Sequence, residues 1–162
     1  MNWQSATACG SVEHDRTAGF AAVERREVQM AEVSVSKRYE VSGTEMWEQI
    51  GDPADIYQWH PAIQATEMTD DGKTRIDTLP DGARVSETIL EQGERHHTYR
   101  IDESPLPVEN LIGTIRVRDE EDAACVVQWD ATFDAAGISD AEATELVRGI
   151  FQTGLDALPS AS

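Results

Sequence analysis

The feature that most constrains the fold of this chain is an amphipathic segment near its C-terminus, residues 139–158. Its apolar residues recur with the i, i+3, i+4, i+7 spacing that places side chains on one face of a helix. These residues are Ala143, Leu146, Val147, Ile150, Phe151, Leu155 and Leu158. Ser139 and Glu142 have the spacing of a capping box, and Pro159 follows the last apolar residue, so both helix ends are predicted. A helix of this length extends roughly 30 Å and needs an equally long hydrophobic partner.

The partner is predicted to be an antiparallel sheet formed by the middle of the chain. Residues 31–41 have the composition of a strand, because their apolar residues recur with period two. Further strands follow at short spacing, each bounded by turn residues such as Asp71-Gly72. They are expected at residues 63–68, 74–79, 84–91, 97–102, 110–118 and 124–133. Connections this short imply sequential antiparallel hairpins.

Two short helices are predicted between the first and second strands. Residues 42–50 switch to helical spacing, and Ser42 or Thr44 could serve as the N-cap. Asp52-Pro53 opens a second helix, which ends at Trp59-His60-Pro61 because the residue before a proline disfavours helical geometry. The predicted fold class is therefore α+β: a curved seven-stranded antiparallel sheet wrapped around a long C-terminal helix, with two short helices after the first strand.

The 162 residues have room for one domain with a sizeable core, expected at residues 30–159. Residues 1–29 carry no sustained hydrophobic period, whereas Met30 begins a segment typical of a natural start. The first 29 residues are therefore either a disordered leader or the product of a misassigned start codon. Residues 160–162 are a short tail.

The net charge of −18 argues against binding to nucleic acids, because their phosphates would be repelled. No apolar run approaches the length of a membrane span, and the first residues lack the pattern of a secretory signal. We therefore predict a cytoplasmic protein without membrane insertion. Only Lys37 and Lys73 are lysines. An acidic chain with so little lysine suggests adaptation to high salt, but an ordinary acidic protein from a GC-rich genome fits equally well.

The order of elements and four local stretches resemble the START/Bet v 1-like (SRPBCC) superfamily, which has the helix-grip fold. The stretches are Trp59-His60-Pro61-Ala62-Ile63, Leu79-Pro80-Asp81-Gly82, Glu103-Ser104-Pro105-Leu106-Pro107-Val108, and the segment from Gln128-Trp129-Asp130 through the last helix. Over residues 31–158 the chain looks most like bacterial proteins labelled polyketide cyclase/dehydrase or lipid-transport-like. This branch also resembles the plant abscisic acid receptors.

The resemblance implies a cavity for a hydrophobic ligand between the sheet and the last helix. In the receptor branch two loops guard the mouth of this cavity, a gate matched here by residues 79–83 and a latch matched by residues 104–107. A pocket lysine in the receptors contacts the carboxylate of the hormone, and His60 takes its place here. This difference, and the missing His-Arg-Leu sequence in the latch, argue against a hormone-like acidic ligand.

His60 and Glu87 are the favoured polar pair of the cavity. The pKa of a histidine lies near neutral pH, so His60 could act as a donor or as an acid/base group; alternatively it caps the helix end and bonds a backbone carbonyl. Glu87 shares a strand face with Val85 and Ile89. If that face points inward, the carboxylate needs a partner, a water or a ligand. If the opposite face points inward, Glu87 lies in solvent.

The predicted ligand-binding residues combine these two with apolar side chains from the strands, the loops and the last helix. They are Trp59, His60, Leu79, Pro80, Val85, Glu87, Tyr99, Ile101, Leu106, Val108, Leu111, Trp129, Leu146, Ile150 and Gly154. Tyr99 and Trp129 could instead be ordinary core aromatics. Gly154 lies on the apolar face of the helix, where it either permits close approach of the sheet or leaves cavity volume.

No metal or other cofactor is predicted. His96 and His97 are adjacent on a strand, so their side chains point to opposite faces and cannot hold one ion. Cys9 and Cys125 are far apart and lack ligand spacing. The acidic run at residues 119–122 lacks the pattern of a calcium loop and is expected to form a solvated hairpin turn.

Three functions remain open at this point. The first is binding of a small, mostly hydrophobic molecule, such as a lipid, polyketide or aromatic metabolite. The second is a polyketide cyclase or dehydrase that uses His60 and Glu87 as catalytic acid and base. The third is an interaction module in which the gate closes over a ligand and creates a surface for a partner. Both a monomer and a homodimer are compatible with the sequence.

Overall fold

The computed structural model describes residues 30–158. The expected leader, residues 1–29, and the expected tail, residues 160–162, lie outside the described residues. The elements are β1 (Ala31–Tyr39), α2 (Gly43–Ile50), the 3-10 turn η1 (Pro53–Asp55), α3 (Ile56–Trp59), β2 (Ala65–Met68), β3 (Thr74–Thr78), β4 (Arg84–Gln92), β5 (His96–Glu103), β6 (Val108–Glu121), β7 (Ala124–Ala135) and α4 (Asp140–Ala157).

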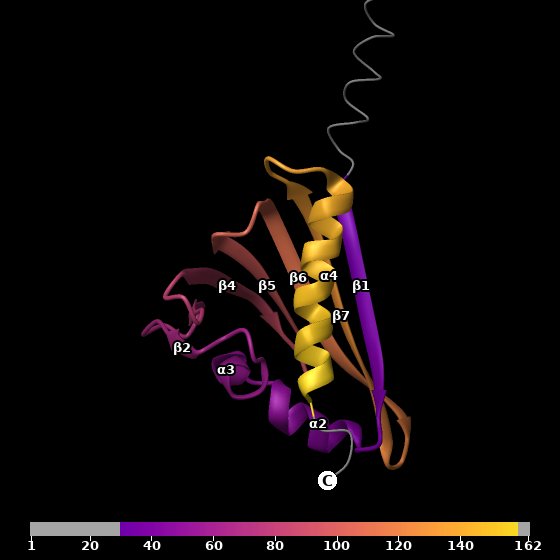
Figure 1. The fold of residues 1–162 in the computed structure, drawn as a ribbon. Helices are drawn as coiled ribbons and strands as arrows, with labels where there is room; N and C mark the ends of the chain where they lie inside the picture. Colours follow the sequence, from indigo (N-terminus) through magenta and orange to yellow (C-terminus); the bar gives the residue numbers. More distant parts are fainter. Residues whose placement is uncertain (1–29, 159–162) are drawn as a thin grey trace, which may run out of the picture. The chain divides into compact units, whose positions relative to one another are not determined.

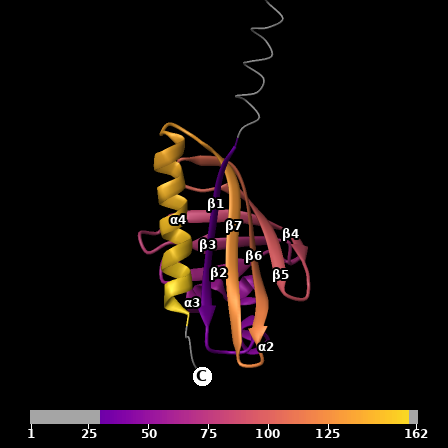
Figure 2. The same ribbon diagram turned by 90° about the vertical axis from the view of Figure 1, so that its right-hand side faces the viewer.

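The strands form one seven-stranded antiparallel sheet in the order β1-β7-β6-β5-β4-β3-β2. Consecutive strands from β2 to β7 are neighbours, and β1 adds to the far side of β7. The sheet curves, and α4 lies along one of its faces, while α2 and α3 lie near the C-terminal end of α4 (Figure 1, Figure 2). This arrangement confirms the predicted α+β helix-grip fold.

The start of α4 forms as the local sequence predicts, whereas Pro159, which was expected to fix its end, lies outside the described residues. The Glu142 amide donates to the Ser139 hydroxyl, and the Glu142 carboxylate accepts from the Ser139 amide, which completes the capping box. At the other end the Tyr39 hydroxyl of β1 donates to the Leu155 carbonyl over 2.5 Å. The helix is thus capped at its start and tied to the sheet near its end.

The apolar stripe of α4 is narrower than expected. The buried residues of the helix are Ala143, Val147, Phe151, Gly154 and Leu155. Leu146 is 37% exposed, so its predicted place in the cavity wall is wrong. It lies one position before Val147, and that step rotates its side chain by about 100°, away from the sheet.

The acidic run also differs from the expected hairpin turn. β6 continues through Glu121, which pairs with Ala124, so the turn contains only Asp122 and Ala123. Asp119 belongs to the strand, and its carboxylate accepts a 3.0 Å bond from Arg95. Side chains from residues 119–122 remain exposed, so the extension of the strand buries no acidic group.

Candidate functional site

A cavity of about 260 Å³ lies between α4 and the inner face of the sheet. It is lined by Ile56, His60, Ala62, Ile63, Arg75, Asp77, Leu79, Val85, Glu87, Tyr99, Ile101, Leu106, Leu111, Trp129, Val147, Ile150 and Phe151. Most of these side chains are apolar. The polar ones come from three adjacent strands, β3, β4 and β5, together with His60 and Trp129.

A buried arginine with two carboxylates forms the polar part of the cavity wall. Arg75 and Glu87 are directly opposite each other on β3 and β4. The Arg75 Nε donates to Glu87 over 2.6 Å and lies 3.5 Å from an Asp77 oxygen. A further guanidinium nitrogen donates to the Pro53 carbonyl over 3.1 Å. All three charged side chains are nearly excluded from solvent, so the cluster compensates its own charges inside the fold.

The two carboxylates share one cation, which changes their proton affinity. Burial raises the pKa of Glu87 to about 7, while the Arg75 charge opposes the rise and the Asp77 charge adds to it. Burial likewise raises the pKa of Asp77, against the effect of Arg75. Near neutral pH the cluster therefore retains a proton on its carboxyl groups for part of the time, and Arg75 has no uncompensated charge for an anion.

Tyr99 and Trp129 place a hydroxyl next to this cluster. The Trp129 Nε1 donates to the Tyr99 hydroxyl over 3.0 Å, and the Arg75 guanidinium lies 5.3 Å from the centre of the Tyr99 ring. The ring lies over Gly113, its partner on β6, where a Cβ would come within 2.5 Å of it. Among the described residues the Tyr99 hydroxyl has no acceptor for its own proton, so it can donate to a ligand.

Both ring nitrogens of His60 are already bonded within the protein. The Nδ1 accepts from the Ala62 amide over 3.1 Å, so the Nε2 carries the proton and donates to the Ile150 carbonyl over 2.9 Å. Burial lowers the pKa of His60, which keeps the ring neutral. This is the alternative in which the histidine bonds a backbone carbonyl, and the bonded ring forms part of the cavity wall.

Gly154 provides the space in which the His60 ring lies. A Cβ at this position would come within 2.5 Å of the His60 ring and 3.1 Å of Trp129. The glycine was expected either to permit close approach of the sheet or to leave cavity volume. The structure shows a third arrangement, because the space beside Gly154 is filled by the His60 side chain at the end of α3.

Ten of the predicted ligand-binding residues line the cavity: His60, Leu79, Val85, Glu87, Tyr99, Ile101, Leu106, Leu111, Trp129 and Ile150. The other five do not line it. Trp59 packs against the His60 and Trp129 rings outside the cavity, and Val108 lines a separate slot. Pro80 is exposed in the gate turn, Leu146 is exposed on α4, and Gly154 lies behind His60.

Seven lining residues were not predicted: Ile56, Ala62, Ile63, Arg75, Asp77, Val147 and Phe151. Arg75 and Asp77 are the two charged residues among them. They alternate with Ile76 on β3, and the polar pair faces inward while Ile76 is only half-buried. The usual preference for apolar residues inside points to the wrong face of this strand. The signal that could have identified them is the gate turn, because a hairpin closed at residues 79–83 places Arg75 opposite Glu87.

Two further expectations concern metals and membranes. Within residues 30–158 no group of three or more candidate ligands could hold a metal ion. His97 is buried beside Trp47, while His96 bonds Glu91 at the surface. None of the helices described in this part of the chain is both long and apolar enough to cross a membrane.

The family model described as polyketide cyclase / dehydrase and lipid transport matches residues 30–162. No curated protein matches the chain. Two solved structures are each 34% identical to it with TM-scores of 0.77: an uncharacterised protein from Bacillus thuringiensis and the protein XoxI from Bacillus cereus. Each match covers 79% of this chain, and 96% and 92% of the two Bacillus chains, respectively.

A more distant likeness extends to an enzyme. The ZhuI aromatase/cyclase from Streptomyces sp. R1128 is 14% identical, with a TM-score of 0.64. The match covers 80% of this chain and 88% of the enzyme. At this identity the likeness concerns the fold alone.

Proposed function

Because the chain belongs to the polyketide cyclase/dehydrase and lipid transport family, we propose that it binds a compact, neutral, mostly apolar small molecule in the cavity beneath α4. The observation that carries this proposal is the composition of the cavity wall, where apolar side chains surround one small group of buried polar atoms. Apolar walls supply affinity, and a few polar groups orient the ligand.

The size of the cavity favours a small ligand. Its volume of about 260 Å³ lies just below the range of about 300–1,000 Å³ that is usual for pockets holding drug-sized molecules. A single aromatic ring with a short substituent, or a short aliphatic chain, fits this volume better than a long acyl chain or a fused polycyclic polyketide. We therefore favour an aromatic or short-chain metabolite over a membrane lipid.

The polar groups favour a neutral ligand with a hydrogen-bond acceptor. The Tyr99 hydroxyl already accepts from Trp129 and can donate its proton to a carbonyl or ether oxygen. A carboxylate would be disfavoured, since Glu87 and Asp77 compensate the charge of Arg75 and would repel a second anion. His60 is neutral, so it supplies no positive charge that could bind a carboxylate ligand.

The test compares acetophenone, ethylbenzene and benzoate by isothermal titration calorimetry. Acetophenone and ethylbenzene have similar shapes but differ in the carbonyl oxygen, and benzoate adds a negative charge. We expect acetophenone to bind about two- to tenfold more tightly than ethylbenzene, the value of one net hydrogen bond. Benzoate should bind more weakly than either compound.

The variant Ala62→Trp is the matched control, because Ala62 lines the cavity and is only half-buried. An indole at this position should fill the cavity and abolish binding of acetophenone while the fold is retained, as judged by circular dichroism. Lack of binding by the wild-type protein to both neutral compounds would contradict the proposal. Tighter binding of benzoate would contradict the proposed ligand class.

An enzyme is the second candidate function. Glu87 favours it, because a buried carboxyl with a pKa of about 7 can exchange protons near neutral pH. The fold likeness to an aromatase/cyclase is in keeping with this idea. The expected pairing with His60 receives no support, because both ring nitrogens are engaged. Glu87 would instead remove a proton next to a ligand carbonyl, while Tyr99 donates to the enolate oxygen.

Exchange of the acetophenone methyl protons in D₂O, followed by NMR, tests this second function. A catalyst that uses Glu87 as base should lose about 10²-fold or more of its exchange rate in Glu87→Gln. A binding protein should show no exchange above the solvent rate. Its Glu87→Gln variant should bind acetophenone with an affinity within a few-fold of the wild-type value.

A further inference from the structure

The sheet is split between its central strand, β5, and the neighbouring strand β6. The β5–β6 ladder runs from His96 opposite Arg116 to Arg100 opposite Ile112 and ends there. Beyond that point β5 stays paired with β4 as far as Glu103. On the other side β6 is paired with β7 down to Val108. The two halves of the sheet therefore diverge toward the latch turn without ladder bonds between them.

An irregularity in β6 lies at the split. Asn110 has a φ of 56°, in the left-handed region, and the β6–β7 register shifts between Glu109 and Ile112. Consequently Asn110 and Leu111 have no ladder partner in either β5 or β7. The Asn110 side chain donates to Asp134 over 2.9 Å, which holds this part of β6 toward β7 and away from β5.

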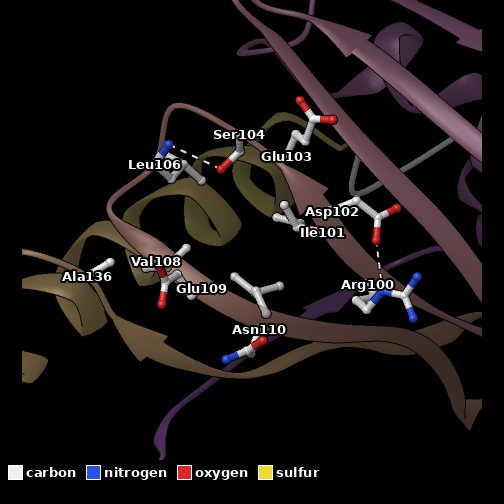
Figure 3. Close-up of a pocket in the computed structure, with 11 residues that line it drawn as sticks. Arg100, Ile101, Asp102, Glu103, Ser104, Leu106, Val108, Glu109, Asn110 and Ala136 are labelled. Atoms are coloured by element: carbon white, nitrogen blue, oxygen red, sulfur yellow. Dashed lines mark hydrogen bonds and ion pairs between the residues drawn. The ribbon is translucent and has the colours of Figure 1, made fainter.

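The divergence leaves a slot of about 650 Å³ between the strands (Figure 3). Arg100 and Asp102 lie on the β5 side of the slot, and Asn110 lies on the β6 side (Figure 3). Ile101, Leu106 and Leu111 line both the slot and the cavity beneath α4. Three aliphatic side chains are therefore shared between the slot and the ligand site.

We propose that this slot is the portal through which ligand enters and leaves the cavity, crossing the sheet rather than passing between the gate and latch loops. The inference rests on the proposed function, since it requires a ligand in the cavity. Leu111 is only 2% exposed and closes the passage in the resting state. Its displacement, with rotation of Ile101 and Leu106, breaks no ladder bonds because none are formed there.

The chemistry of the passage suits the ligand that we propose. The outer part of the slot is lined by polar and charged side chains such as Arg100 and Asp102, whereas the three residues that it shares with the cavity, Ile101, Leu106 and Leu111, are aliphatic. By contrast, the gate turn is closed by backbone bonds, in which Leu79 donates to Ala83 and Gly82 donates to Leu79. Opening at the gate would have to move this hydrogen-bonded turn as a unit.

The test bridges the slot with a covalent linker. Continuing the β5–β6 register would place Asp102 opposite Asn110, across the gap. The double variant D102C/N110C, with Cys9 replaced by serine and buried Cys125 retained, is linked with bismaleimidoethane and checked by mass spectrometry. Binding and exchange of 4-fluoroacetophenone are then measured by ¹⁹F NMR on the same protein before and after linking.

We expect linking to slow both association and dissociation by about tenfold or more while the Kd stays within about threefold, because the linker lies outside the cavity. The matched control is T98C/T114C on the same two strands. Thr98 and Thr114 are partners in the intact ladder, with their hydroxyl oxygens 2.9 Å apart. A linker there should leave the exchange rates unchanged.

The possible failures of this experiment are separable. If 4-fluoroacetophenone does not bind the unlinked protein, the proposed function fails and the portal fails with it. If it binds but exchanges equally fast after linking at residues 102 and 110, the portal alone is overturned. Equal slowing by both linkers would also overturn the portal, because the effect would then come from stiffening of the strands.

Discussion

At the scale of single residues, one proton decides the charge of the cavity. Arg75 contributes one positive charge, whereas Glu87 and Asp77 together contribute two negative charges when both are ionised. Burial penalises this excess and raises the pKa of Glu87 to about 7. Protonation of Glu87 therefore makes the cluster neutral, which suits a neutral ligand.

This proton predicts a pH-dependent stability. The folded-state pKa of Glu87 is raised above the ordinary value of 4.5 to about 7. Its contribution to stability is therefore fully present below about pH 4.5 and is lost as pH rises through about 7. Relative to Glu87→Gln, the wild-type protein should lose at most about 3 kcal/mol over this interval.

Urea denaturation of both proteins between pH 4.5 and 7.5 measures the difference. Subtracting the two stability curves removes the contribution of the carboxylates that do not interact with Glu87, and the remaining difference comes from Glu87 and from Asp77, which is coupled to it. Parallel curves would contradict the raised pKa. A difference of the opposite slope would mean that Arg75 holds Glu87 ionised at all these pH values.

Tyr99 gives a second prediction at this scale. Replacing Tyr99 with phenylalanine removes the proposed donor to the ligand and also the acceptor of the Trp129 indole N–H. The buried N–H is then unsatisfied, so we expect a loss of about 1–3 kcal/mol in unfolding free energy. The preference for acetophenone over ethylbenzene should disappear in the same variant. Retention of that preference would show that Tyr99 does not orient the ligand.

At the scale of elements, a structural feature could be predicted from the sequence when the interactions that form it lie within a few residues of one another. The start of α4 was predictable because Ser139 and Glu142 bond each other within one turn. The engagement of His60 was not, because its acceptor Ile150 lies 90 residues away on another element. The inward face of β3 was missed for a related reason, since the buried charge of Arg75 is compensated in part by Glu87, which lies on another strand.

Two glycines of α4 provide a matched pair of substitutions. Gly149 is exposed and an added Cβ would meet nothing within 4 Å, so Gly149→Ala should stabilise the protein by about 1 kcal/mol through helix propensity. At Gly154 the same Cβ would meet the His60 ring at 2.5 Å. That ring is bonded on both sides and cannot move freely, so Gly154→Ala should destabilise the protein despite the better propensity.

Thermal unfolding of the two alanine variants measures both effects. Opposite shifts of the Tm are expected, upward for Gly149→Ala and downward for Gly154→Ala. An upward shift for both would mean that His60 relaxes without loss of its hydrogen bonds. The packing of Gly154 against His60 would then not constrain the helix.

At the scale of the whole molecule, the net charge follows directly from the sequence, since counting charged residues requires no knowledge of the fold. The order of helices and strands could also be predicted, because hydrophobic periods and turns are local signals. The cavity was accessible only through the resemblance, because an empty volume depends on how distant side chains such as Leu111 and Phe151 meet. The slot could not be predicted from the sequence, since it forms where β5 and β6 are not paired.

The net charge of −18 leads to a prediction that separates the two explanations of the acidic composition. Repulsion among surface carboxylates destabilises the compact state, and salt screens it with a Debye length of about 10 Å at 0.1 M and about 3 Å at 1 M. For an ordinary acidic protein, the unfolding free energy in urea should rise mainly below about 0.3 M NaCl and then level off, because most of the screening is complete by then. A protein adapted to high salt should instead continue to gain stability into the molar range.

Repeating the titration near pH 4.5, where many carboxylates are protonated, provides the control, since the gain from screening should shrink there. A stability that does not change with salt at neutral pH would contradict both explanations and would mean that the acidic side chains are spaced widely enough not to repel one another.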